Sequence, residues 1–288
     1  MTWAPWPLVS VVLATYEWPA ALDAQLRALA EDADAATEVV VADDGSGSAT
    51  RDVIEAWHGR GLRVEHAWQP DEGWRKTRVL NLAALAARGE LLLFLDGDVL
   101  PRRGFLQAVR RASRPGWFLA SKRLLLPPEL TRSVLERGLP VWRWSALGWV
   151  LRRPRALVAR GRYPGRPGVL FPLRDRRRPW RPHLADFVPP YDAYGYFTGV
   201  WREDFERVNG FDQRFEGWGG EDEDLAARLR HAGLRCGWPG PRATLLHLHH
   251  EPRKGLHRSN QPLVQETKAA GRVEALVGLR ELRAELAV

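Results

Sequence analysis

The sequence predicts an α/β fold in which a mostly parallel sheet carries helices on both faces. Apolar, β-rich runs alternate with helical segments through roughly the first hundred residues. This alternation is typical of parallel strands joined by crossover helices. In addition, short acidic turns follow two of the runs, and such sheets bind ligands beyond the carboxyl ends of their strands. We therefore expect a ligand site at that edge.

The elements of this first part follow in regular order. Residues 8–14 form a continuous apolar run, as expected of a strand covered on both faces. Residues 19–30 then predict a helix with a proline in its first turn. The later elements are a strand at 38–42, a helix at 52–58, a strand at 62–68, a helix at 76–87 and a strand at 90–95. Residues 1–126 thus form the first half of the domain.

The pattern changes after residue 126. Residues 127–192 are rich in Arg, Trp and Pro, so we expect an irregular insertion or a pair of short helices there, without a second core. The second half of the domain, at 193–260, has a strand at 196–201, helices at 203–208 and 223–231, and a last strand at 243–249. Residues 261–288 predict a tail of one or two amphipathic helices docked on the body, with a homodimer or membrane contact left open.

Composition restricts the class of protein. The chain has 288 residues and 45% hydrophobic content, which indicates a globular protein. Apolar runs such as 91–95 fall far below the ~20 residues that a membrane-spanning helix needs. The apolar run at 7–14 has no basic leader or small-residue cleavage site, so we interpret it as a strand and not as a signal peptide. A single cysteine, Cys236, excludes an internal disulfide and favours the cytoplasm, with peripheral contact at the inner membrane face left open.

The charge of the chain implies an anionic partner. The net charge is +8 and the pI is about 10.2. Arginines concentrate between Arg143 and Arg181, where Asp175 is the only acid. This stretch could clamp a phosphorylated or lipid-linked acceptor, lie on a membrane surface, or be a solvated basic face. We do not expect nucleic acid as the partner, because acidic strand ends facing phosphates would weaken binding.

Two acidic turns carry the first chemical signal. Asp96, Gly97 and Asp98 follow a predicted buried strand, and two carboxylates there can bind one hard cation. Chance pairs of Asp are common at turns, but the second strand also ends in a pair, Asp43 and Asp44. A carboxylate at that second turn could accept hydrogen bonds from a nucleobase or ribose.

The stretch "GWGGEDEDL" at 217–225 places four consecutive acids in a basic chain. Acids in the first turn of a helix suit the helix dipole, which accounts for Glu223 and Asp224. Capping does not require Glu221 and Asp222. The sequence therefore indicates that these two serve chemistry.

Four ordered segments together resemble a known family. They are "VSVVLATYEWPAAL", "VVVADDGSGSAT", "QPDEGWRKTRVLNLAALAARGELLLFLDGDVLP" and "GFDQRFEGWGGEDEDLAARLRHAG". They are similar to the family-2 inverting glycosyltransferases of the GT-A fold. The last segment resembles the C-terminal module of galactosyltransferases and of chondroitin-polymerase-type enzymes. The resemblance covers roughly residues 7–110 and 194–252.

The resemblance implies a nucleotide-sugar site in the first half of the domain. Asp44, with Thr15 and Glu17 nearby, would hold uridine, and Lys76 and Asn81 would lie beside the phosphates or the sugar. The donor-binding residues that it implies are Thr15, Tyr16, Glu17, Asp44, Gln69, Lys76, Asn81, Asp96, Gly97, Trp218 and Gly219. Trp218 could stack on a sugar ring or pack in the interior.

The resemblance also implies a divalent metal, Mn²⁺ or Mg²⁺, bound by Asp98 and less directly by Asp96. A histidine near the end of the domain would complete the site. Alternation in a strand points 247 and 249 to one side and 250 to the other. The His-x-Glu-Pro pattern of the relatives falls on His249, so we expect His249 first and His247 second.

An inverting transfer needs one carboxylate to take the proton of the acceptor hydroxyl. The resemblance places this base at Asp222, with Glu221 binding substrate hydroxyls. The expected enzyme moves a hexosyl or N-acetylhexosaminyl group from a UDP-sugar to a hydroxyl acceptor, such as a cell-surface polysaccharide or lipid-linked glycan.

Two other classes of protein share some of these features. A nucleotidyltransferase would need a glycine-rich loop after the first strand, and "ATYEWPAAL" has none. The alternative that stays open is a basic nucleic-acid- or membrane-binding protein with a degenerate, non-catalytic version of the fold.

Overall fold

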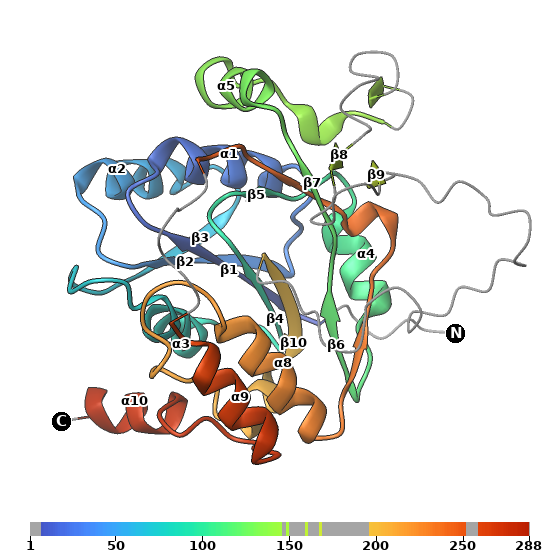
Figure 1. The fold of residues 1–288 in the computed structure, drawn as a ribbon. Helices are drawn as coiled ribbons and strands as arrows, with labels where there is room; N and C mark the ends of the chain where they lie inside the picture. Colours follow the sequence, from blue (N-terminus) through green and yellow to red (C-terminus); the bar gives the residue numbers. More distant parts are fainter. Residues whose placement is uncertain are drawn as a thin grey trace, which may run out of the picture.

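A computed structural model describes residues 7–145, 148–149, 159–160, 167–168, 196–251 and 259–287. Its main sheet has seven strands in the order β11-β6-β10-β4-β1-β2-β3 (Figure 1). Only β10 in this sheet runs antiparallel to its neighbours β4 and β6. The predicted α/β fold with a mostly parallel sheet is confirmed.

The elements have the following bounds. The strands of the main sheet are β1 (Val9–Thr15), β2 (Thr37–Asp43), β3 (Arg63–Trp68), β4 (Leu91–Leu95), β6 (Trp117–Ala120), β10 (Phe197–Trp201) and β11 (Arg235–Gly237). A second sheet contains β5 (Val99–Leu100), β12 (Leu245–His247) and β7 (Arg123–Leu125), and a third pairs β8 (Ala159–Arg160) with β9 (Pro167–Gly168). The α-helices are α1 (Pro19–Ala30), α2 (Ser48–Trp57), α3 (Lys76–Ala86), α4 (Phe105–Ala112), α5 (Pro128–Arg137), α7 (Arg202–Arg207), α8 (Glu221–His231), α9 (Gln261–Ala269) and α10 (Leu279–Leu286). Two 3₁₀ turns are η1 (Val141–Arg143) and η4 (Pro241–Ala243).

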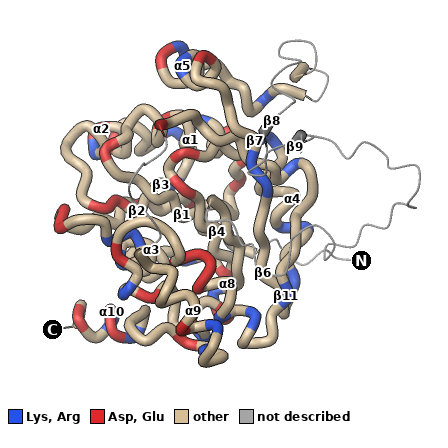
Figure 2. Tube along the Cα trace, viewed as in Figure 1, with Lys and Arg blue, Asp and Glu red and all other residues tan. Residues whose placement is uncertain are grey.

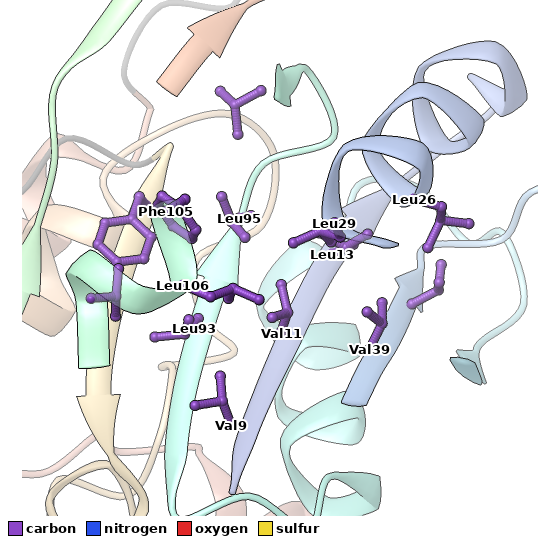
Figure 3. Packing of buried hydrophobic residues seen from close by; sticks show 14 of the residues in the cluster. Val9, Val11, Leu13, Leu26, Leu29, Val39, Leu93, Leu95, Phe105 and Leu106 are labelled. Carbon is purple, nitrogen blue, oxygen red and sulfur yellow. The ribbon is translucent and has the colours of Figure 1, made fainter. Parts of the chain in front are cut away.

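The two faces of the sheet are covered by different helices because side chains alternate along each strand. In β1, Val9, Val11 and Leu13 point toward α1, α2 and α4, and they pack with Leu26 and Phe105 among others (Figure 3). The intervening Val12 and Ala14 belong to the opposite cluster, which contains residues of α3, α7, α8 and α10. Both faces are buried around β1 and β4, which explains why these two strands are nearly continuous apolar runs.

The region after residue 126 begins with the short helix α5 and the 3₁₀ turn η1, which agrees with the short helices expected there. Helix α5 packs its Leu130 and Val134 into a third buried cluster with Trp142, Leu124 and Leu246. We expected this stretch to add no hydrophobic core. Its first part instead contributes a small set of buried apolar residues, which stand among arginines and prolines in the sequence. The arginine-rich remainder lies largely outside the described residues. In the part of the chain that the structure describes, no helix is both long and apolar enough to cross a bilayer.

Several short elements were not predicted. Strands β6, β7 and β11 contain only four, three and three residues, which is too short for a clear periodic signal. Helix α4 has eight residues with one apolar face, and its pattern is present in the sequence. The C-terminal tail forms two helices, α9 and α10, and α9 packs beside α8.

Candidate active site

The candidate site lies where β1, β2 and β4 end side by side. These strands are parallel, with Thr15 opposite Asp43 and Leu13 opposite Leu95. Their carboxyl ends therefore bring the turns after them to one edge of the sheet. Helices α3 and α8 begin near this edge, because Lys76 at the start of α3 contacts both Asp96 and Glu221.

Asp44 is held firmly at the end of β2. Its Oδ1 accepts a hydrogen bond from Gln69 Nε2 at 2.5 Å, and its Oδ2 accepts one from the Arg75 backbone N–H at 2.9 Å. Burial raises the pKa of Asp44 above its ordinary value despite these donors. The predicted donor residues Asp44 and Gln69 are thus brought together, along with Thr15, whose carbonyl accepts the Asp44 N–H.

The turn after β1 presents an aromatic ring beside Asp44. The Tyr16 side chain is 50% exposed, and its hydroxyl donates to Asp71 at 3.0 Å. Glu17 has a positive φ of 47°, and its backbone N–H bonds Ser46 Oγ while its carboxylate accepts the Gly47 N–H. The turns after β1 and β2 are therefore tied to one another.

Gly97 is required by the close approach of two turns. A Cβ at this position would lie 2.6 Å from the carbonyl oxygen of Ala14 at the end of β1. Only glycine therefore fits between Asp96 and Asp98 without moving β1. This close contact fixes the position of the Asp96–Asp98 turn relative to the end of β1.

Lys76 joins the two halves of the site. Its Nζ donates to Asp96 Oδ1 at 2.6 Å and to Glu221 Oε1 at 3.0 Å. Burial works to lower the pKa of Lys76, but Asp96, Glu221 and Asp222 outweigh it and hold that pKa well above its ordinary value. The ammonium therefore stays charged and holds α8 to the end of β4.

The two acids that begin α8 differ in charge state. Burial works to raise the pKa of Glu221, but the Lys76 ammonium outweighs it and keeps that pKa below its ordinary value. Burial and the neighbouring charge of Glu221 instead raise the pKa of Asp222 well above its ordinary value, although Lys76 opposes them. Glu221 Oε2 is buried and accepts no hydrogen bond from a donor group of the described residues, and the Glu221 and Asp222 carboxyls lie close enough to share a proton. One stable carboxylate thus lies next to one that binds a proton readily.

Asp98 lies against two histidines at the end of β12. Its Oδ2 is 3.1 Å from His247 Nε2 and 3.1 Å from His250 Nε2. Burial works to raise the pKa of Asp98, but these imidazoles hold it well below its usual range. Ligand atoms of the three residues all lie within 4.8 Å of one another.

His250 takes the place that we expected for His249. Strand β12 ends at His247, so strict alternation does not continue to 249 and 250. His249 is exposed and is not part of the cluster, and its backbone N–H donates to Thr131 Oγ1 at 2.8 Å. The second histidine of the pair could have been found from the sequence only by allowing the strand to end early.

The Asp98 cluster suits a divalent metal. Asp98 Oδ1 is buried and has no hydrogen-bond partner among the residues that the structure describes. Leaving such an oxygen unsatisfied costs free energy, which a cation would recover. One carboxylate and two imidazoles are a common donor set for transition metals.

The glycine-rich loop before α8 is held in place by α9. Gly217 and Gly219 adopt positive φ angles of 75° and 86°, and Trp218 between them is 40% exposed. Asn260 Nδ2, next to α9, donates to the carbonyl oxygens of Glu216 and Gly219 at 2.9 Å each. No motif in the sequence indicated this contact, because Asn260 lies outside the acidic segment.

The structure does not bring Asn81 to the site. Asn81 is fully buried, its Nδ2 donates to the Phe211 carbonyl at 2.8 Å, and its Oδ1 accepts the Phe211 N–H at 2.9 Å. Both atoms of its amide thus bind backbone. Its role is to fix the loop before α8 against α3.

Family models match two parts of the chain. The model described as glycosyl transferase family 2 matches residues 10–114. The model described as N-terminal domain of galactosyltransferase matches residues 181–251. The first contains Asp44, Asp96 and Asp98, and the second contains Glu221, Asp222 and both histidines of the cluster.

Curated relatives and solved structures agree with these matches. The validoxylamine A glucosyltransferase of Streptomyces hygroscopicus subsp. jinggangensis (strain 5008) is 34% identical over 244 residues, covering 79% of this chain and 52% of that protein. The chain spans about half the length of the first curated relatives that it matches.

Solved glycosyltransferases have a similar fold. The mannosyltransferase PcManGT of Pyrobaculum calidifontis, in complex with GDP-Man and Mn²⁺, has a TM-score of 0.56 at 20% identity, covering 92% of this chain and 63% of that chain. TarS of S. aureus in complex with UDP-GlcNAc has a TM-score of 0.57 at 15% identity, covering 97% and 70%. These likenesses confirm the GT-A fold.

Proposed function

The chain belongs to the family-2 glycosyltransferases and has a galactosyltransferase-like C-terminal module, and on this premise we propose that it transfers a sugar from a UDP-sugar to an acceptor hydroxyl with inversion. One observation carries the proposal. Lys76 joins Asp96 to Glu221, and so brings the acidic start of α8 against the donor edge of the sheet. Asp222 is next to this junction.

Asp222 is the base in the proposed single displacement. The acceptor oxygen forms a bond to the anomeric carbon, the bond from that carbon to the diphosphate oxygen breaks, and the hydroxyl proton passes to the Asp222 carboxylate. A base works best when its pKa lies near the working pH. The raised pKa of Asp222 supports this role, whereas Glu221 stays ionised beside Lys76.

Glu221 and Trp218 bind the sugar in this proposal. Glu221 Oε2 accepts no hydrogen bond from a donor group of the described residues and can accept one from a sugar hydroxyl. The exposed Trp218 ring can cover a sugar face. Asp44 and the Tyr16 ring would recognise the uracil and ribose, since both lie at the ends of β1 and β2.

Asp98, His247 and His250 are the residues that would hold a divalent cation. Two imidazoles favour Mn²⁺ over Mg²⁺, because Mg²⁺ prefers oxygen ligands. When bound, the ion would neutralise the negative charge on the leaving diphosphate. The Mn²⁺ in the P. calidifontis mannosyltransferase supports this assignment.

The proposed donor sugar comes from a relative and the proposed acceptor from the family resemblance. The name of the Streptomyces relative makes glucose the donor sugar to test first. The acceptor that we propose is a hydroxyl of a cell-surface polysaccharide or lipid-linked glycan. The alternative is a non-catalytic nucleic-acid- or membrane-binding protein. It does not explain why the carboxylates of Asp96, Asp98, Glu221 and Asp222 lie at one edge of the sheet.

A donor screen tests the proposed function. The protein is incubated with UDP-glucose, UDP-galactose, UDP-GlcNAc or GDP-mannose, and release of nucleoside diphosphate is measured with Mn²⁺, with Mg²⁺ or with EDTA. We expect one UDP-sugar to be turned over with Mn²⁺ and not with EDTA. Absence of turnover with every nucleotide-sugar would contradict the proposal, and undiminished turnover in EDTA would remove the metal.

A further inference from the structure

A second cavity lies outside the active site, between α4, η1 and η4. Its volume is about 730 Å³, which is in the range of small-molecule sites. Five arginines line it, together with two tryptophans: Arg102, Arg103, Arg110, Arg143, Arg242, Trp142 and Trp144. We call this the arginine cavity. Basic residues colour the chain blue around α4 (Figure 2).

The carboxylates at the arginine cavity are already bound. Asp34 pairs with Arg110 at 2.5 Å, and Glu31 pairs with Arg143 at 2.6 Å. Asp32 accepts hydrogen bonds from two backbone N–H groups at the start of α4, each at 2.7 Å. Each acid thus has a close partner within the protein, and Glu31 also attracts Arg103, so these three acids face five arginines.

Among the described residues, Arg102, Arg103 and Arg242 form no close ion pair with a carboxylate, although the charge of Arg103 acts on Glu31 at longer range. Arg102 makes one weak hydrogen bond, from Nη2 to the Trp144 carbonyl at 3.3 Å, and its buried Nε has no acceptor in the described part of the chain. Burial alone lowers the pKa of Arg102. A buried cation without a counter-ion costs free energy, and an anionic ligand would recover it.

The arginine cavity is at the other edge of the sheet from the active site. Asp32 and Asp34 precede β2, whereas Asp43 ends it. Seven residues of strand separate the two ends by roughly 20 Å. A ligand in the cavity therefore leaves the donor edge free.

We propose that the arginine cavity binds a phosphate-bearing ligand, either a soluble phosphomonoester or a phospholipid headgroup. Guanidinium groups bind phosphate with paired hydrogen bonds, and three arginines without a close carboxylate line this cavity. The volume accommodates a phosphate together with the group that it esterifies. This site goes beyond the proposed transferase reaction, and no part of that reaction depends on it.

Two probes distinguish the sources of the phosphate. Binding of glucose 6-phosphate is measured by calorimetry in EDTA and without donor, which keeps the metal-dependent site out of the signal. Binding to phosphatidylglycerol vesicles is measured by sedimentation, with phosphatidylcholine vesicles as the control. Binding of either probe supports the proposal and identifies the source; binding of neither overturns it.

Paired variants locate the binding. The double variant Arg103→Ala/Arg242→Ala removes two exposed cations from the cavity, and we expect affinity for the bound probe to fall at least tenfold. The matched variant Arg51→Ala/Arg132→Ala removes the same charge from exposed positions on α2 and α5 and should bind normally. Equal affinities in both variants would overturn the proposal. Sugar-transfer activity with a soluble donor should stay unchanged in both.

A third variant separates a binding role from a structural one. Arg102→Met keeps the length of the side chain and removes the buried charge. We expect it to melt at the same temperature as the parent protein or higher, and to lose the thermal stabilisation that the bound probe gives the parent. A variant that melts lower and still binds normally would show that Arg102 only supports the fold.

Discussion

The first turn of α8 contains two pairs of acids with opposite surroundings. Asp224 is fully buried and saturated, since Arg228 Nε and Thr267 Oγ1 donate to it at 2.7 and 2.6 Å. Glu223 pairs with Lys268 of α9 at 2.5 Å. Glu221 Oε2 accepts no hydrogen bond from a donor group of the described residues, and Asp222 beside it has a strongly raised pKa. Of these four consecutive acids, Glu223 and Asp224 stabilise the fold through their partners, whereas Glu221 and Asp222 remain able to interact with a substrate.

Helix geometry explains how neighbours come to differ so much. Successive residues turn by about 100°, so the four acids face different directions. Asp224 faces Arg228 one turn later on the same helix, while Glu221 faces Lys76. Arg228 in turn donates to the carbonyls of Val208 and Gly210. The paired acids therefore hold the helix at the angle that presents the other two to the sheet edge.

The largest effect is expected for Asp222→Asn. Removal of the base should lower kcat about 10²–10⁴-fold, with donor affinity little changed. Because the fold raises the pKa of Asp222, protonation favours the folded state, and this contribution is lost as the pH rises through the raised value. The variant should therefore be at least as stable at pH 8. Near-normal transfer with normal donor binding would contradict the assignment.

The adjacent histidines provide a second comparison. His250→Ala should weaken Mn²⁺ affinity at least about tenfold, because it removes a proposed metal ligand. Even the loss of a residue that only hydrogen-bonds to a ligand typically weakens metal affinity about 10–100-fold. His249→Ala is the matched control, since its ring does not belong to the cluster, and it should bind Mn²⁺ normally. Calorimetric titration with Mn²⁺ measures both. If His249→Ala weakened Mn²⁺ binding and His250→Ala did not, His249 would be the ligand, as the sequence predicts.

As the pH is lowered, kcat should begin to fall at a higher pH than it would if the base were a carboxylate with an ordinary pKa. Below the raised pKa of Asp222, kcat should fall about tenfold per pH unit, because the protonated side chain cannot accept another proton. Glu221 and Asp96 promote this protonation and Lys76 opposes it. A pH–kcat profile whose acid side matches that of an ordinary, unshifted aspartate would show that Asp222 is not the base.

Stability changes should separate the paired acids from each other. Asp224→Asn leaves the buried Arg228 without its counter-ion, and should lower the free energy of unfolding by about 3–5 kcal/mol. Denaturant titration measures the loss, while kcat per folded molecule stays within a few-fold of normal. A 10²-fold fall in kcat without loss of stability would instead place Asp224 in the reaction.

Glu223→Gln should have the smallest effect. Its ion pair with Lys268 is partly exposed, with side-chain exposures of 32% and 25%, and such pairs contribute about 0–1 kcal/mol. Activity and stability should both stay close to normal. A large loss of either would mean that α9 is held to α8 chiefly by this pair.

Much of the sheet could be predicted from the sequence because buried strands and their acidic turns leave strong local signals. The run at β1 and the turn at Asp96–Asp98 are examples. The contacts of Lys76 with Glu221 and of Asn260 with the glycine loop join residues far apart in the chain, and no periodicity encodes them. Asn81 was misplaced for the same reason, since only the fold brings it to Phe211. His249 was chosen over His250 because the short strand β12 was expected to be longer.

The central claim is that Asp222 serves a single displacement, and the configuration of the product tests it most directly. The α-linked UDP-sugar that is turned over in the donor screen is supplied with an acceptor, and the anomeric proton of the first product is followed by NMR. We predict a β-linked product, with formation abolished in Asp222→Asn. An α-linked product would contradict a single displacement and the role of Asp222 as its base.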